Sequence, residues 1–458
     1  YPKSLKITMG VLVTKSSLEI GDIKQARHFL EILRLDDLTP AEKSQLDLEE
    51  GRLRELTGDF DGAVSKWEKV RDGHHRPSRA KAIVARMELL LKLGRMTRKE
   101  AIEDLEKLRF GWRGDDFEFK MLRRLGGLYL DQGLFREGLD RLRQAATYYR
   151  THPEAPEVTQ KMSDAFTGLF LNDGADTLPP ITTIAIYDEF KELTPAGAQG
   201  DEMIRKLADR LVGVDLLERA ASLLNSQVRF RLEGAEKARV GTQLALVHVL
   251  GKEYQQAIAV LDETSFPNLP EPILTQRRHI RAKSLLGMGR RAQALEILVG
   301  DQSTDADLLR TELFWNAREW SKTSQALRRL IRGSQAKPGE KLDREQAAHI
   351  LNYAVALTLS GNDRALSRLR SDYGGSMERT ELKDAFRMIT TPESLGLIDP
   401  ADVVARVKEV ESFQSFMAAY RKRLKKQTLS ELVPGLAPIE AKKPAAKKPD
   451  GEAPDAKA

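Results

Sequence analysis

The most enzyme-like part of the sequence is FGWRGDDFEF at residues 110–119, which contains the adjacent carboxylates Asp115 and Asp116. Two neighbouring acids beside glycines and aromatics are able to bind a metal ion or to exchange protons with a substrate. The alternative is structural, with Asp115 capping a helix while Trp112 and Phe117 fill the junction between two helix pairs. No histidine or third acid stands at a fixed spacing from the two carboxylates, so the sequence favours the structural interpretation.

The other residues that could carry chemistry form no recognisable catalytic or metal site. His74 and His75 are adjacent in a loop, but no further ligand lies at metal-binding spacing. The chain has no Cys, which excludes a disulfide, a zinc ribbon and a thiol nucleophile. It also lacks a phosphate loop, a dinucleotide fingerprint and a nucleophile elbow. We therefore expect a protein without enzymatic activity, cofactor or metal, and keep the Asp115/Asp116 loop as the lesser, enzymatic alternative.

Composition indicates a helical protein with a large polar surface. Of the 458 residues, 41% are hydrophobic, 31% are charged and only 6% are aromatic. No apolar run approaches the ~20 residues that span a bilayer. The formal net charge is +6, but residues 421–458 alone carry ten Lys/Arg and five Asp/Glu. The rest of the chain is therefore nearly neutral, and the basic character belongs to the C-terminal tail.

Residues 122–145, LRRLGGLYLDQGLFREGLDRLRQA, predict two short helices joined by a tight turn. Each half has apolar residues at helical spacing, and Gly133 stands at the reversal, where glycine accepts a positive φ. Gly126 and Gly138 are placed where the two helices would approach closely. Neither apolar stripe is fully covered within one hairpin, so the unit needs neighbours of the same kind.

The same pattern recurs along the chain. Turn residues at positions 21, 58, 94 and 133, and again at 215, 252 and 289, are separated by steps of 36 to 39 residues. Weaker copies follow at Arg318 and Gly361, and the interval from 133 to 215 leaves room for one further pair. A near-constant period in the mid-thirties predicts a helical solenoid.

The repeat resembles the tetratricopeptide repeat, or TPR, family, as found in bacterial multi-repeat proteins. The best copy matches that family's pattern at Leu125, Gly126, Tyr129, Gly133, Phe135, Gly138, Leu142, Ala145 and Pro153. The resemblance covers most of residues 4–370. It implies an all-α fold, a right-handed superhelical solenoid of about nine or ten antiparallel helix pairs.

We expect five segments. Residues 1–150 form an N-terminal array, 151–200 a degenerate repeat with long loops, and 201–370 a C-terminal array. Residues 371–432 are expected to be capping helices. Residues 433–458 have a Lys/Pro/Ala composition without apolar periodicity, which predicts a disordered tail.

The family resemblance also implies a function. TPR proteins bind peptides or helices on a concave face lined by the first helix of each pair, so we expect a protein-binding scaffold. Alignment with the family places a modest basic stripe on that face, suited to a partner with an acidic segment. Its members are Lys120, Arg123, Arg124, Arg205, Lys206, Arg239, Gln243 and Lys283. The alternative is that these are ordinary solvated charges on helix surfaces.

Another class of function also stays open. The basic residues beyond position 420 suit nucleic acid or an anionic surface, although no aromatic residues interleave with them to stack on bases. The chain starts at Tyr1 without Met or a signal peptide, which indicates a processed product or part of a longer chain. Long Cys-free repeat arrays with Lys/Ala/Pro tails look like those of bacterial envelope proteins. A bacterial envelope or periplasmic setting is therefore expected, with the cytoplasm as the alternative.

Overall fold

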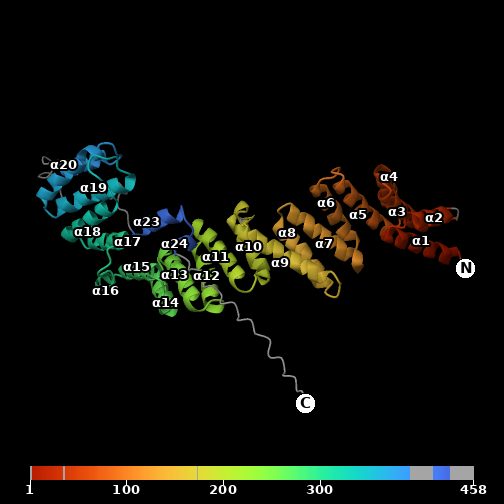
Figure 1. Cartoon of the computed structure of the whole chain (residues 1–458), viewed down its shortest axis with the longest axis horizontal. Helices are drawn as coiled ribbons and strands as arrows, with labels where there is room; N and C mark the ends of the chain where they lie inside the picture. Colours follow the sequence, from red (N-terminus) through yellow and green to blue (C-terminus); the bar gives the residue numbers. More distant parts are fainter. Residues whose placement is uncertain (1–2, 35–36, 173, 392–415, 434–458) are drawn as a thin grey trace, which may run out of the picture. The chain divides into compact units, whose positions relative to one another are not determined.

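The computed structural model describes residues 3–34, 37–172, 174–391 and 416–433, and these parts are built from helices in sequential antiparallel pairs (Figure 1). The chain divides into two compact units, residues 1–195 and 196–458. The all-α fold of TPR-like helix pairs expected from the repeats is confirmed. The finer five-segment division stays a prediction, and the tail beyond residue 433 lies outside the described residues.

Unit 1 contains five helix pairs. The helices are α1 (Lys3–Ile20), α2 (Ile23–Arg34), α3 (Pro40–Leu56), α4 (Phe60–Arg71), α5 (Arg76–Lys92), α6 (Arg98–Gly111), α7 (Asp115–Asp131), α8 (Phe135–Tyr148), α9 (Ala155–Leu171) and α10 (Pro180–Phe190), with 3₁₀ turns η1 (Gly174–Thr177) and η2 (Lys191–Leu193) on either side of α10.

The described residues of unit 2 form five more pairs and three additional short helices. The helices are α11 (Ala198–Gly213), α12 (Leu217–Phe230), α13 (Gly234–Leu250), α14 (Tyr254–Glu263), α15 (Glu271–Gly287), α16 (Arg291–Ile297), α17 (Thr304–Asn316), α18 (Trp320–Gly333), α19 (Arg344–Leu359), α20 (Asp363–Met377), α21 (Lys383–Thr390), α23 (Phe416–Leu424) and α24 (Leu429–Leu432). The capping helices expected over residues 371–432 lie partly outside the described residues, which omit 392–415.

The turns between paired helices have the backbone conformation that the repeat pattern predicts. All nine turn positions identified in the sequence have positive φ, from 57° at Arg318 to 84° at Gly58. Six of them are glycine, which adopts this conformation without a steric penalty. Asp215, Lys252 and Arg318 adopt it with a side chain attached, at a cost in backbone strain.

The α7–α8 hairpin shows how closely paired helices pack. A Cβ atom added to Gly126 would lie 2.7 Å from Cγ of Leu142 and 3.0 Å from the carbonyl oxygen of Gly138. A Cβ on Gly138 would likewise lie 2.8 Å from the side chain of Leu130. The close approach predicted at these two glycines is therefore present, and it lets Leu142 reach full burial.

Helix starts also follow local sequence signals. Thr39 caps α3, its side chain accepting a hydrogen bond from the backbone N–H of Glu42 while the Glu42 carboxylate accepts from the backbone N–H of Thr39. Pro40 occupies the first turn, where its missing N–H is harmless. The sequence Thr39-Pro40-Ala41-Glu42 is typical of such a capping box.

Within each unit, the first helices of successive pairs lie beside one another. Thus α1 contacts α3, α3 contacts α5, α13 contacts α15 and α15 contacts α17. We call the surface that these odd-numbered helices share the first-helix face, with α1 to α9 forming that of unit 1 and α11 to α19 that of unit 2. A stack of helix pairs leaves this surface uncovered by the second helices.

Candidate protein-binding faces

The enzyme-like loop at residues 110–119 is held by structural contacts. Asp115 begins α7 with φ 66°, and its carboxylate accepts hydrogen bonds from the backbone N–H groups of Phe117 (2.8 Å) and Glu118 (3.4 Å). Its neighbour Asp116 lies 2.8 Å from Nζ of Lys120 and 2.9 Å from Nε2 of His152. Among the described residues, no group of three or more His, Asp or Glu side chains is placed to hold a metal ion.

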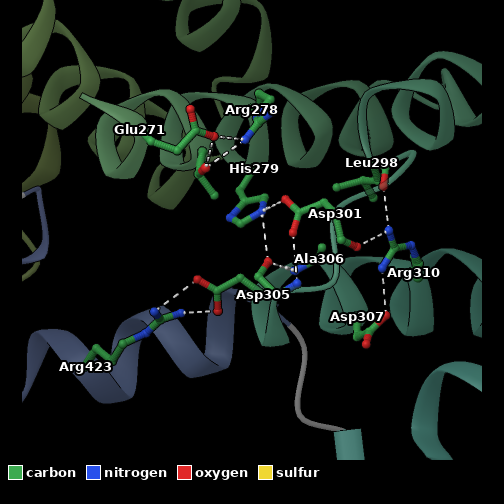
Figure 2. Close-up of polar contacts among 12 residues, drawn as sticks. Glu271, Arg278, His279, Leu298, Asp301, Asp305, Ala306, Asp307, Arg310 and Arg423 are labelled. Atoms are coloured by element: carbon green, nitrogen blue, oxygen red, sulfur yellow. Dashed lines mark hydrogen bonds and ion pairs between the residues drawn. The ribbon is translucent and has the colours of Figure 1, made fainter. Parts of the chain in front are cut away.

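The structure brings together a Ser, a His and an Asp that sequence reasoning missed (Figure 2). Nε2 of His279 lies 2.7 Å from Oδ2 of Asp301 and 3.3 Å from Oγ of Ser303. A catalytic triad needs the carboxylate on one ring nitrogen and the hydroxyl on the other. Here one nitrogen serves both, and Ser303 caps α17 by accepting a hydrogen bond from the N–H of Ala306 at 3.2 Å.

The cluster instead supports the junction between α15 and α17. Burial would raise the pKa of the Asp301 carboxyl, but hydrogen bonds from Ser303 and His279 outweigh burial and lower that pKa to about 2. Arg310 also donates to the carbonyl oxygens of Leu298 and Asp301, both at 2.5 Å. His279 is only 3% exposed, so its imidazole ring is nearly closed to solvent.

The first-helix face of unit 1 contains an open groove of about 910 Å³. Its lining comes from α1, α3, α5, α6, α7 and α9 and includes seven acidic and seven basic residues, with apolar side chains such as Leu48, Val84 and Met121 among them. A groove with an apolar floor and both signs of charge suits a protein segment better than a polyanion.

The three basic residues predicted for this groove all line it, and each is paired with an acid. Lys120 pairs with Asp116, Arg123 with Glu154, and Arg124 with Glu88 through two hydrogen bonds of 2.6 and 2.8 Å. The predicted basic stripe is therefore electrically compensated in the structure. Their role in partner binding stays a prediction.

A buried acid in the same groove was not anticipated from the sequence. Glu49 is 6% exposed, and its Oε2 has no hydrogen-bond partner, although Arg52 approaches it at 3.5 Å. Burial raises the pKa of the Glu49 carboxyl, and the charge of Arg52 offsets this in part. Glu49 and Glu50 look like an ordinary solvated pair in the sequence, so only the packing of α3 distinguishes them.

In unit 2 the predicted residues are engaged in contacts of their own. Arg205 pairs with Glu202 at 2.5 Å and Arg239 with Glu236 at 2.9 Å, while Lys206 is half-buried on α11. The side chain of Arg239 is only 7% exposed, and Lys283 is buried against Glu312. Their part in binding an outside partner stays a prediction.

The remaining predicted residue, Gln243, contacts a segment from near the end of the chain. Its Nε2 lies 3.5 Å from Oγ of Ser430, which is 187 positions further along the chain. Ser430 belongs to α24, and α23 and α24 lie along the first-helix face of this unit (Figure 1). The face on which a partner was expected therefore holds a segment of the chain itself.

The fold and these two faces define an all-α solenoid of TPR-like helix pairs. By sequence, the chain matches no known family and no curated protein. Among solved structures it is similar to NprR in complex with its cognate peptide NprX, with 10% identity, coverage of 72% of this chain and 96% of that chain, and a TM-score of 0.29.

Two further solved structures match this chain with similar sequence identity, coverage and TM-score. The P58(IPK) TPR domain has 15% identity, coverage of 81% and 100%, and a TM-score of 0.24. The APC/C hetero-tetramer Cut9-Hcn1 has 13% identity, coverage of 86% and 95%, and a TM-score of 0.26. No helix within the described residues is both long and apolar enough to cross a bilayer.

Proposed function

We propose that the protein is a scaffold that holds a helical segment of another protein, of mixed charge, in the groove of unit 1. The observation that carries this proposal is the open groove of about 910 Å³ along the first helices. Support comes from unit 2, where the corresponding face holds two short helices. The mixed charge of the partner follows from the balanced acids and bases that line the groove.

Specific residues give the groove its selectivity. Arg124 presents a planar guanidinium that is now bound to Glu88 and would exchange that partner for a carboxylate of the bound segment. Glu49 offers a buried acceptor for a donor on the segment. The preference for an acidic segment remains a prediction, because such a segment has to compete with the acids already in the groove.

The alternative function, binding of nucleic acid or an anionic surface by the basic residues beyond position 420, has less support among the described residues. Lys422 lies 2.7 Å from Glu345, and Arg423 makes two hydrogen bonds to Asp305. Both cations are thus neutralised locally, which weakens their attraction for phosphates. The bacterial and envelope setting suggested by the sequence stays part of this proposal.

The test uses a partner identified by crosslinking and then titrated against purified variants. Arg123→Glu/Arg124→Glu should weaken its binding by at least about tenfold, roughly 1.4 kcal/mol, because two groove cations become acids. Lys69→Glu, an exposed position on the second helix α4, is the matched control and should bind normally.

A charge swap separates recognition from structural damage. Glu88→Arg/Arg124→Glu keeps the ion pair within the groove but reverses its direction. The proposal expects this variant to lose affinity as well. If the swap restores wild-type affinity, the effect of the double charge reversal came from a broken internal pair, and the groove assignment is wrong.

A further inference from the structure

Residues 416–433 cross the first-helix face of unit 2 and contact five successive first helices. The contacts are made to Asp209 on α11, Gln243 on α13, Gln276 on α15, Asp305 on α17 and Glu345 on α19. Every one of these residues belongs to the first helix of its pair. The segment therefore occupies the surface that the solenoid leaves uncovered.

Three apolar anchors fix the segment. Tyr420 is 2% exposed, Leu429 is 1% exposed and Val433 is fully buried. Burying an aromatic and two aliphatic side chains of this size removes enough apolar surface to hold a short segment, at about 1.5–3 kcal/mol for each aliphatic side chain before ordering costs. The anchors belong to two helices of nine and four residues, which are too short to be stable alone.

Polar contacts set the position and direction of the segment. Arg423 binds Asp305 through two hydrogen bonds of 2.7 and 3.1 Å (Figure 2), and its guanidinium also lies 4.1 Å from the ring centre of Tyr420. Towards the end of the segment, Gln276 donates to the carbonyl oxygen of Leu432 at 3.0 Å. Such a paired guanidinium and aromatic form a recognition element of defined geometry.

We propose that the first-helix face of unit 2 is a docking site for a short helix carrying Tyr and Arg three residues apart, followed by a turn with two aliphatic anchors. Residues 416–433 are its internal ligand, and an outside protein segment with the same anchors binds by replacing them. The site is separate from the groove of unit 1, so this inference does not depend on the function proposed for that groove.

The arrangement has the features of a ligand bound in place. The ten helix pairs of the two units all precede residue 378, so none of them includes a helix of the segment. Covalent attachment makes its binding intramolecular, at an effective concentration on the order of mM. An outside segment with equal contacts therefore binds weakly until the internal one is released.

The test measures binding of a fluorescently labelled peptide of residues 416–433 to the full chain by polarisation. Arg423→Asp in the chain weakens binding of the internal ligand but leaves the first-helix face of unit 2 intact. The wild-type peptide should therefore bind this variant at least about tenfold more tightly than it binds the wild-type chain. Arg421→Asp, the same charge change at an exposed position of α23, should behave as wild type.

Reversing the charge of Asp305, on the first-helix face of unit 2, tests the specificity of its pairing with Arg423. A chain with Asp305→Arg should fail to bind the wild-type peptide but should bind a peptide carrying Arg423→Asp. A chain with Tyr420→Ala and Leu429→Ala releases the internal ligand by removing its apolar anchors and should bind the wild-type peptide at least as well as Arg423→Asp.

Two results would overturn the inference. One is equally weak peptide binding by all of these chains while their cooperative thermal unfolding is unchanged. The other is loss of cooperative unfolding in the Tyr420→Ala/Leu429→Ala chain, which would make the segment a permanent part of the fold. Either result leaves the groove of unit 1 untouched, since that groove is tested with a different ligand.

Discussion

At the residue scale, two acids on first helices, Glu50 on α3 and Asp209 on α11, have pKa values shifted in opposite directions. Glu50 is held by Arg34 and Lys66, and although burial opposes ionisation, these cations lower its pKa to about 2. Asp209 instead accepts a hydrogen bond from the backbone N–H of Ser430 at 3.0 Å. Burial raises the pKa of Asp209 to about 6, against hydrogen bonds from Ser430 that lower it.

Asp209 therefore gives unit 2 a specific pH dependence. Its folded pKa of about 6 lies above the ordinary value of 3.8, so its contribution to stability is fully present below pH 3.8 and is lost as pH rises through 6. Comparing Asp209→Asn with wild type in urea, we expect wild type to gain about 1.4 kcal/mol relative to the variant between pH 7 and pH 5.

Two neighbouring charged residues also shift the pKa of Asp209. Glu202 raises the Asp209 pKa and Arg205 lowers it, and both remain in the variant, so the difference between the two proteins isolates Asp209. A difference in the free energy of unfolding that stays constant from pH 7 to pH 5 would show that Asp209 titrates in its ordinary range.

At the element scale, the turn residue decides how easily a helix pair closes. Gly133 has φ 73°, and a Cβ atom added to it would meet nothing within 4 Å, so its constraint is conformational rather than steric. Lys252 has φ 63° at the same point of its repeat and carries the strain that Gly133 avoids. The two positions form a matched pair for experiment.

We expect opposite effects from exchanging the residue types. Gly133→Ala should lower the free energy of unfolding by about 1 kcal/mol, whereas Lys252→Gly should leave it unchanged or raise it by a few tenths to about 1 kcal/mol. Gly111→Ala, at a helical glycine with free space and ordinary φ, is the control and should be neutral or stabilising. Equal losses at both turns, measured by chemical denaturation, would contradict this account of the repeat.

The same elements show what the sequence could predict. The period of the turns and the apolar spacing within residues 122–145 were sufficient for the paired helices, because both signals are local. The capping box at Thr39 and the close approach at Gly126 were predictable for the same reason. The ion pairs of Arg124 with Glu88 and Lys283 with Glu312 were not, since they join neighbouring repeats.

The contact of α23 and α24 with unit 2 was the least predictable feature. Residues 416–433 contact positions up to 221 residues earlier, and a basic, amphipathic stretch near the end of a chain gives no indication of where it docks. Arg423 therefore looked like part of a solvated tail. The apolar residues that stand among the charges, such as Tyr420, Leu429 and Val433, carried the signal of burial.

At the scale of the whole molecule, two units built from the same repeat present different faces. Unit 1 has an open groove with seven acids and seven bases, while the face of unit 2 is covered by residues 416–433. With the functions proposed above for the two faces, the protein would hold one partner directly and admit another only after the internal segment is replaced. This combination follows from helix pairs that stack with their first helices side by side and leave one surface of those helices accessible.

Site-specific photo-crosslinking of a partner to unit 1 tests most directly whether the first-helix face is the binding surface. A photo-reactive residue replaces Lys81 on α5, which lines the groove, or Lys69 on α4, which is exposed on a second helix. The account predicts that the partner becomes crosslinked at position 81 and not at position 69. Crosslinking at position 69 alone, or equally at both positions, would contradict the claim that the first-helix face is the binding surface.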